Sequence, residues 1–130
     1  HKKDVSVRTA QASGVIFLKS DTIKKIYTNQ IVKGNVLTTA KIAGIQAVKK
    51  TSDLIPLCHP LQISHADFEY HEVENGIKVL CTVKCSEKTG VEMEALTGVS
   101  TALLTIYDMC KAIDSNMTIT EIRLDKKEKK

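Results

Sequence analysis

Residues 88–114, KTGVEMEALTGVSTALLTIYDMCKAID, decide the fold of this chain of 130 residues. Their apolar side chains are too dense for a surface helix, so the stretch is predicted to form a helix that is mostly buried. Charged groups on a buried helix must be paired or used, because an isolated charge in apolar surroundings is very costly. At roughly 100° per residue, Asp108 and Lys111 stand about 60° apart, and Glu94 projects within about 40° of the same direction. Three ionisable groups on one line indicate a functional site, and an Asp108–Lys111 ion pair at an exposed rim is the simpler alternative.

The composition is that of an ordinary globular protein, with 42% hydrophobic and 26% charged residues. A chain of 130 residues is predicted to form one domain, residues 1–130, that is long enough to bury a core. The net charge of +4 belongs to the two ends, because the chain opens with HKKD and closes with KKEKK. Residues 126–130 are therefore predicted to form a mobile, solvated tail, and a nucleic-acid footprint over the whole surface is not indicated.

Location and processing leave few signals in this sequence. It contains neither a signal peptide nor a run of 18 uninterrupted apolar residues, and its four cysteines are too scattered for a disulfide scaffold. These observations favour a protein of the reducing cytoplasm that does not associate with a membrane. The opening HKKD has no Met, so we do not expect residue 1 to be the native N-terminus.

Alternation and helical periodicity predict the remaining elements. They are a strand at 13–18, a helix at 20–29, a helix at 36–53 capped by Asn35, strands at 66–73 and 77–85 joined by an Asn75-Gly76 turn, and a strand at 117–124. Without the short helix at 20–29, the order is βαββαβ, the split arrangement of ferredoxin-like domains. The predicted fold is therefore α+β and ferredoxin-like, an antiparallel sheet with helices packed on one face. Because this fold hosts many functions, function must be argued from the site.

Metal binding and RNA binding are two functions that the sequence invites without supporting. Cys81 and Cys85 share a strand face but lie about 13 Å apart at the usual rise, too far to chelate one ion. His65 and His71 are separated by about 20 Å on the same reckoning, so no metal site is predicted. Ferredoxin-like sheets that bind RNA present stacking aromatics, and no RNP-type motif occurs here. An RNA-binding sheet protein is kept as an alternative class.

A polar pocket for a phosphorylated small molecule is the third candidate. Lys33 precedes the predicted start of a helix, where free backbone N–H groups favour an anion. His59 lies in a loop stiffened by two prolines, and a desolvated Lys111 beside Asp108 would titrate near neutrality as an acid or base. Each residue alone has an ordinary explanation, as a solvated lysine or a hydrogen-bonded loop histidine. Taken together they favour an enzyme.

Two strings carry a resemblance to a known family. KGNVLTTAKIAGIQAVKKTSDLIPLCHPL at 33–61 and KTGVEMEALTGVSTALLTIYDMCKAID at 88–114, with DVS at 4–6, closely resemble the MoaC family. Its members are the cyclic pyranopterin monophosphate synthases of molybdenum cofactor biosynthesis. The resemblance implies a lyase that rearranges 3′,8-cyclo-7,8-dihydro-GTP into cyclic pyranopterin monophosphate and releases pyrophosphate. It implies no cofactor, and it leaves open whether a divalent cation accompanies the phosphates.

The same resemblance implies the residues of the site, motif by motif. The implied catalytic residues are Asp108, Lys111, Lys33 and His59. The implied substrate-binding residues are Leu57, Cys58, His59, Glu92, Met93 and Glu94. Three features depart from the family pattern: Asn35 stands where Asp is usual, the interval between DVS and Arg8 is shorter, and KKEKK stands in place of a glycine-rich end. The last two bear on phosphate contacts near the termini and not on the core chemistry.

Assembly is predicted from the family and from the helices. The resemblance implies a homo-oligomer, a hexamer built as a trimer of dimers, with sites formed between subunits. Small residues along 36–53 and an apolar central helix predict an exposed apolar patch on a monomer. Lys33 and His59 also lie on segments that need not reach Asp108 within one subunit. A purely structural assembly subunit is the remaining alternative class.

Overall fold

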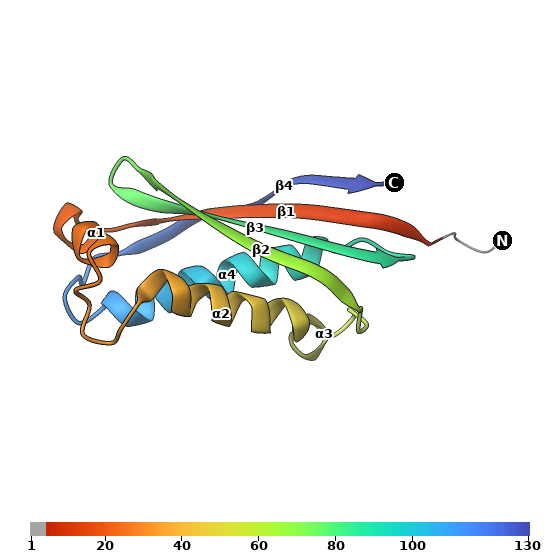
Figure 1. The fold of residues 1–130 in the computed structure, drawn as a ribbon, viewed down its shortest axis with the longest axis horizontal. Coiled ribbons are helices and arrows are strands. Elements are labelled where there is room, and N and C mark those ends of the chain that lie inside the picture. The colour runs from red at the N-terminus through yellow and green to blue at the C-terminus, as the bar shows by residue number, and fades with distance from the viewer. Residues whose placement is uncertain (1–4) are drawn as a thin grey trace.

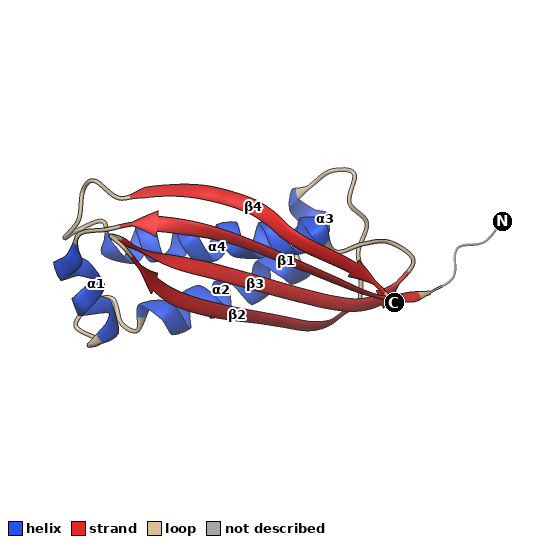
Figure 2. Cartoon of the chain, turned by 90° about the horizontal axis from the view of Figure 1, so that it is seen from above, coloured by secondary structure: helices blue, strands red, loops and turns tan. Residues whose placement is uncertain are grey.

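The computed structural model describes residues 5–130, so Asp4 of the DVS string and the basic pair Lys2 and Lys3 lie outside the described residues. The elements are β1 (Ser6–Phe17), α1 (Ser20–Tyr27), α2 (Val36–Lys49), α3 (Thr51–Leu54), β2 (Ile63–Val73), β3 (Gly76–Glu87), α4 (Glu92–Cys110) and β4 (Thr118–Lys129). The strands form one antiparallel sheet in the order β2-β3-β1-β4. α2 and α4 lie side by side on one face of the sheet (Figure 1), and α1 lies at one end of it (Figure 2). The predicted α+β, ferredoxin-like arrangement with helices on one face is confirmed.

The hydrophobic core lies between α4 and the two central strands. Side chains alternate along a strand, so every second residue of β1 and β3 faces the helices. Ile16 of β1 and Ile77 of β3 are register partners, and both are fully buried. Leu103 and Ile106 of α4 are also fully buried in the same cluster. The prediction that a mostly buried helix forms within residues 88–114 is confirmed.

Glycines set how closely the two long helices approach the sheet and each other. A Cβ atom added at Gly98 of α4 would lie 2.6 Å from Val48 Cγ2 and 3.0 Å from Cys81 Sγ. A Cβ atom at Gly44 of α2 would collide with the ring of Phe68. The small residues predicted to allow a close approach along 36–53 therefore pack, at Gly44, against β2 of the same chain.

The predicted mobile tail at 126–130 is wrong, because this segment belongs to the sheet. β4 continues to Lys129, opposite Arg8 of β1, and Val7 and Lys130 exchange two backbone hydrogen bonds of 2.9 Å. β1 is correspondingly longer than predicted and begins at Ser6 instead of residue 13. The backbone N–H and C=O groups along this edge of β1 need partners, and the KKEKK segment supplies them despite its charge.

The predicted helix at 36–53 is divided in the structure. Asn35 caps it as predicted, since its Oδ1 accepts a hydrogen bond of 3.0 Å from the N–H of Thr38. α2 ends at Lys49, and the short α3 follows from Thr51 to Leu54. The break redirects the chain into the loop that carries His59. No helix within residues 5–130 has the length and hydropathy needed to cross a membrane.

Candidate functional site

One cluster of charged side chains lies at the C-terminal end of α4. Lys111 Nζ lies 2.9 Å from Asp108 Oδ1, and Lys33 Nζ lies 3.6 Å from Asp108 Oδ2. Lys33 Nζ also donates a hydrogen bond of 3.2 Å to the backbone oxygen of Asp108. Lys33 reaches this position from the turn before α2, where Gly34 has a φ of 121° that favours glycine. The expectation that Lys33 need not reach Asp108 within one subunit is therefore corrected, because the two residues are in contact.

The carboxylate of Asp108 is held ionised between two ammonium groups. The hydrogen bond from Lys111, with the charges of Lys111 and Lys33, lowers the pKa of Asp108 below its usual range. The side chains of Asp108 and Lys111 are 60% and 57% exposed in this chain. The predicted desolvation of Lys111 therefore does not occur within one chain, where the pair has the geometry of a rim ion pair.

A second cluster lies at the opposite end of α4, around a cavity of about 140 Å³. The cavity is lined by Leu57, Cys58, His59, Leu61, Thr89, Gly90, Glu92, Met93 and Glu94. The structure thus brings together all six residues that were predicted to bind substrate. Two segments far apart in the sequence meet here, the proline-rich loop before β2 and the first turn of α4. We call this space the His59 cavity.

Glu94 is the unusual group of the His59 cavity because its residue is only 5% exposed. Burial raises the pKa of its carboxyl, and the nearby charge of Glu92 adds to this effect. The backbone N–H of Glu94 and the charge of His59 act in the opposite direction. A carboxyl whose pKa is raised keeps its proton to a higher pH than an ordinary glutamate does, which suits it to exchanging a proton with a ligand.

The two clusters are separated along α4 and do not form one site within a chain. Glu94 and Asp108 are fourteen residues apart, about 21 Å along a helix axis. Glu94, predicted to project in a similar direction to Asp108 and Lys111, therefore belongs to a different cluster at the other end of the helix. His59 lies with Glu94, and Lys33 lies with Asp108.

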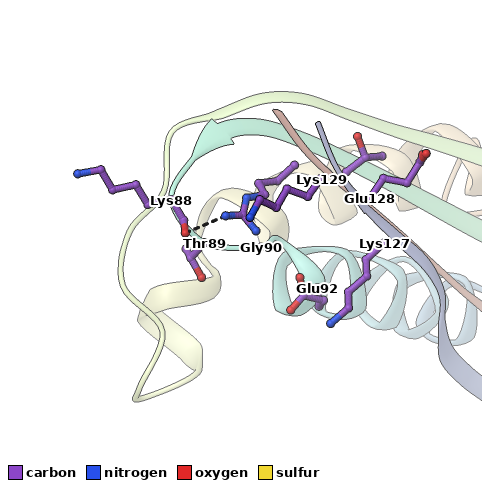
Figure 3. A pocket seen from close by; sticks show the side chains of 9 residues that line it. Lys88, Thr89, Gly90, Glu92, Lys127, Glu128 and Lys129 are labelled. Atoms are coloured by element: carbon purple, nitrogen blue, oxygen red, sulfur yellow. Dashed lines mark hydrogen bonds between the residues drawn. The ribbon is translucent and has the colours of Figure 1, made fainter. Parts of the chain in front are cut away.

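A third group of polar residues was not predicted from the sequence. A cavity of about 360 Å³ lies where β1 begins and β4 ends, beside the start of α4 (Figure 3). Its lining residues are Arg8, Thr9, Lys88, Thr89, Gly90, Glu92, Lys127, Glu128 and Lys129. We call it the basic hollow. The charged composition of 126–130 predicts a tail and gives no sign of this cavity. Lys127 and Lys129 are two residues apart, so they lie on one face of any strand formed there.

Metal ligands are not gathered at any of these places. Within residues 5–130, no group of three or more His, Cys, Asp or Glu side chains is arranged to hold a metal ion. The four cysteines are free thiols, and Cys81 and Cys85 are buried on the helix-facing side of β3. Burial raises the pKa of Cys81 to about 12, so this thiol is a packing group and not a nucleophile.

The fold and its clusters define a class of protein. Lysines around a carboxylate and, at a separate cavity, a histidine with a buried carboxyl are groups that enzymes use to transfer protons. Residues 1–130 match the family model described as "MoaC family", and the chain belongs to this family. The resemblance found in its motifs is thereby confirmed.

Curated relatives of the chain share one name. It is 54% identical over 127 residues to the cyclic pyranopterin monophosphate synthase of Clostridium perfringens (strain SM101), a match that covers 96% of this chain and 80% of the relative. It is 52% identical over 128 residues to the synthase of Campylobacter jejuni serotype O:2, covering 97% and 82%. A probable cyclic pyranopterin monophosphate synthase of Archaeoglobus fulgidus is 54% identical over 116 residues, covering 89% and 74%.

Proposed function

We propose that this chain is a cyclic pyranopterin monophosphate synthase, a cytoplasmic lyase of molybdenum cofactor biosynthesis. Its substrate would be 3′,8-cyclo-7,8-dihydro-GTP, and its products cyclic pyranopterin monophosphate and pyrophosphate. The observation that carries the proposal is identity of 52–54% along nearly the whole chain to enzymes of that name. The gathering of the LCH and EME segments around one cavity supports it.

The reaction makes defined chemical demands on the residues. A sugar hydroxyl oxygen attacks the α-phosphorus, and the bond from that phosphorus to the bridging oxygen breaks. The bridging oxygen leaves with the electron pair as part of pyrophosphate, while the hydroxyl proton passes to a base. Opening and closing the rings moves further protons without net oxidation or reduction, so the proposal includes no resident cofactor. Groups that bind anions and exchange protons are therefore sufficient.

The two described clusters suit complementary parts of this reaction. We assign proton transfer at the reacting atoms to Lys33, Asp108 and Lys111, together with His59. The ordered ammonium groups around Asp108 can donate protons or stabilise developing negative charge. We assign binding of the ring system to the His59 cavity, that is to Leu57, Cys58, His59, Glu92, Met93 and Glu94.

A site that contains both clusters requires two chains, because about 21 Å of helix separates Glu94 from Asp108 within one. The proposal therefore includes a homo-oligomer, a hexamer built as a trimer of dimers, in which the His59 cavity of one subunit meets the Asp108 cluster of a neighbour. Exposed apolar side chains support such contacts, with Leu57 97% and Leu104 60% exposed.

Subunit exchange between inactive variants tests the proposed function and the shared site together. His59→Ala and Lys111→Ala proteins are mixed, and conversion of the cyclised GTP intermediate to pterin product is measured. Random pairing in a two-fold dimer would restore about one quarter of the sites. Lys33→Ala mixed with Lys111→Ala is the matched control, because both lysines belong to one cluster and no intact site can form.

The possible results separate the parts of the proposal. No product from the wild-type protein would refute the function itself. An active wild type whose His59→Ala and Lys111→Ala mixture stays inactive despite demonstrated exchange would refute the shared site. Activity restored equally in the control mixture would contradict the assignment of both lysines to one cluster.

A further inference from the structure

Asp114 is a buried carboxylate to which the proposed reaction gives no role. The residue is 2% exposed, and it lies in the turn that follows α4. Its Oδ2 accepts hydrogen bonds of 2.9 Å from the backbone N–H of Lys19 and from the hydroxyl of Thr22. Burying a charged group is costly even when it is hydrogen-bonded, so a carboxylate at this position calls for an explanation.

The carboxylate of Asp114 caps α1 from a distant part of the chain. Lys19 is the N-cap residue of α1, and a lysine side chain has no acceptor for the free N–H groups at the start of a helix. Burial alone would raise the pKa of Asp114. Hydrogen bonds from Lys19, Thr22 and Asn116 outweigh burial and hold the pKa of this carboxyl below its usual range. The group therefore stays ionised and joins the start of α1 to the end of α4.

The turn after α4 connects Asp114 to Lys111. Helical hydrogen bonding continues beyond Cys110, because the N–H of Asp114 donates a bond of 3.1 Å to the Cys110 oxygen. Lys111 lies within this turn, about 5 Å along the helix axis from Asp114. Fixing the end of the turn therefore fixes the backbone from which Lys111 reaches Asp108.

The segment after α1 connects the same link to Lys33. The N–H of Gln30 donates a hydrogen bond of 2.8 Å to the oxygen of Lys25, and that of Gly34 donates one of 3.1 Å to Ile31. These tight turns would carry a shift of α1 to Lys33. In both Figures 1 and 2, α1 lies at the end of the sheet where α4 ends.

Packing leaves a gap between these two segments. A cavity of about 360 Å³ is lined by Ile31 and Val32 from the segment after α1 and by Met109 and Ile113 from the end of α4. Val32 is fully exposed. A close-packed contact would hold two segments in one relative position, and a cavity removes part of that restraint. The hydrogen bonds of Asp114 supply a restraint that packing lacks here.

Resting on the proposed function, we propose that Asp114 is a positioning residue, which holds Lys111 and Lys33 around Asp108 by joining the start of α1 to the end of α4. Its buried carboxylate acts through the two lysines and not on the substrate. Without it, both ammonium groups would still be present but would lose their fixed positions.

The pKa of Asp108 reports the position of the two lysines without turnover. The hydrogen bond and charge of Lys111, with the charge of Lys33, lower this pKa, so loosening them should raise it toward the ordinary value of an aspartate. It is measured by carbon NMR of protein labelled at its aspartate carboxyls, and the Asp108→Asn variant identifies the signal. Asp114→Asn and Thr22→Val should each raise the pKa of Asp108, whereas Thr22→Ser, which keeps the hydroxyl, should leave it unchanged.

Turnover should change in the same variants. Asp114→Asn should lower kcat for pterin formation by at least about tenfold and change KM by less than about twofold, because the displaced lysines are assigned to proton transfer. Thr22→Val should have a smaller effect in the same direction, since the bond from Lys19 remains. Thr22→Ser should keep kcat within about twofold of the wild type.

Thr51→Val is the matched control for the loss of a buried hydroxyl. Thr51 is 1% exposed, and its hydroxyl donates hydrogen bonds of 2.9 and 3.1 Å to the backbone oxygens of Ala47 and Val48. It lies where α2 gives way to α3, at the opposite end of the molecule from α1 (Figure 1). Thr51→Val should lower the melting temperature, as Thr22→Val does, and leave the pKa of Asp108 unchanged.

Several results would overturn the inference. It fails if the pKa of Asp108 is the same in the wild type, Asp114→Asn and Thr22→Val, or if Thr51→Val raises it as much as Thr22→Val does. It also fails if folded Asp114→Asn protein has the kcat of the wild type. Should Asp114→Asn not fold, the comparison of Thr22→Val with Thr22→Ser decides. A wild-type protein that forms no pterin product would refute the proposed function, while the pKa comparison would still show whether Asp114 positions the lysines.

Discussion

Replacing Asp108 by Asn removes the carboxylate that joins two lysines and preserves the shape of the side chain. In the native cluster, Lys111 and Lys33 approach the two oxygens of Asp108 at 2.9 and 3.6 Å. The neutral amide offers one acceptor where there were two ionic contacts. Lys33 then keeps only its hydrogen bond to the backbone oxygen, and two cations stand beside a neutral group. We expect both ammonium groups to lose their fixed positions.

The size of the effect follows from exposure and from the role of the cluster. General acid–base groups contribute roughly 10²- to 10⁴-fold to turnover, so Asp108→Asn should lower kcat by at least about 100-fold. Folding should be nearly unaffected, because the Asp108 and Lys111 side chains are more than half exposed and exposed ion pairs contribute little to stability. Loss of activity with an unchanged melting temperature is the expected combination.

Asp21→Asn is the matched control for this experiment. Asp21 and Lys25 form another exposed ion pair on a helix, at 3.3 Å, away from the described clusters. Pterin formation from the cyclised GTP intermediate and thermal unfolding are measured for both variants. If Asp108→Asn retains turnover as Asp21→Asn does, Asp108 and Lys111 form only a rim ion pair and their catalytic assignment is wrong.

The pH dependence offers a second check on Asp108. Contacts with Lys111 and Lys33 lower the pKa of this carboxyl, so it stays ionised to a lower pH than an ordinary aspartate does. Its contribution is lost only as the pH falls through the lowered pKa. Turnover of the wild-type protein should therefore show no limb from Asp108 between about pH 5 and 8. A limb in that window that disappears in Asp108→Asn would contradict this reasoning.

Three other substitutions have distinct expected outcomes. Lys33→Ala should lower kcat/KM for pterin formation from the cyclised GTP intermediate by at least about tenfold, through loss of a charge-assisted contact. Glu94→Gln should resist denaturant better than wild type at pH 8 but not at pH 4. Burial raises the pKa of Glu94, so the stability that its protonated form gives the fold is lost as the pH rises through the raised pKa. An equal difference in stability between variant and wild type at both pH values would argue against this. Gly98→Ala should lower the free energy of unfolding in urea by a net of about 1 kcal/mol. Overpacking against Val48 costs about 1–3 kcal/mol, whereas alanine in place of glycine favours the helix by about 1 kcal/mol. A variant more stable than the wild type would show that α4 shifts to accommodate the methyl group without cost.

Local patterns predicted the order of elements because each element has its own period. The alternation along β2 and β3 and the dense apolar run of α4 are properties of single segments. The extents of β1 and β4 could not be found in this way. Whether 126–130 is a tail or a strand depends on a free edge of β1, more than 110 residues earlier in the chain. A charged composition disfavours a strand locally, but an unpaired backbone edge outweighs it.

The site shows the same division between local and non-local information. Motif resemblance selected Leu57, His59 and Glu94, and the structure places them around one cavity. It gave no reason to select Arg8, because that guanidinium comes to line a cavity only when β4 pairs with β1 and the chain turns at Lys88. Residues whose function depends on strand register cannot be recognised before the register is known.

The helical projection of α4 illustrates a further limit. Rotation per residue places Glu94 and Asp108 in similar directions, while the rise per residue sets them about 21 Å apart. Their environments also differ, because Glu94 is 5% exposed and the Asp108 side chain is 60% exposed. A buried carboxyl with a raised pKa and an exposed one with a lowered pKa are suited to opposite tasks, the first to holding a proton and the second to holding cations. If one substrate needs both, the shared site proposed above would bring them together from two copies of the chain.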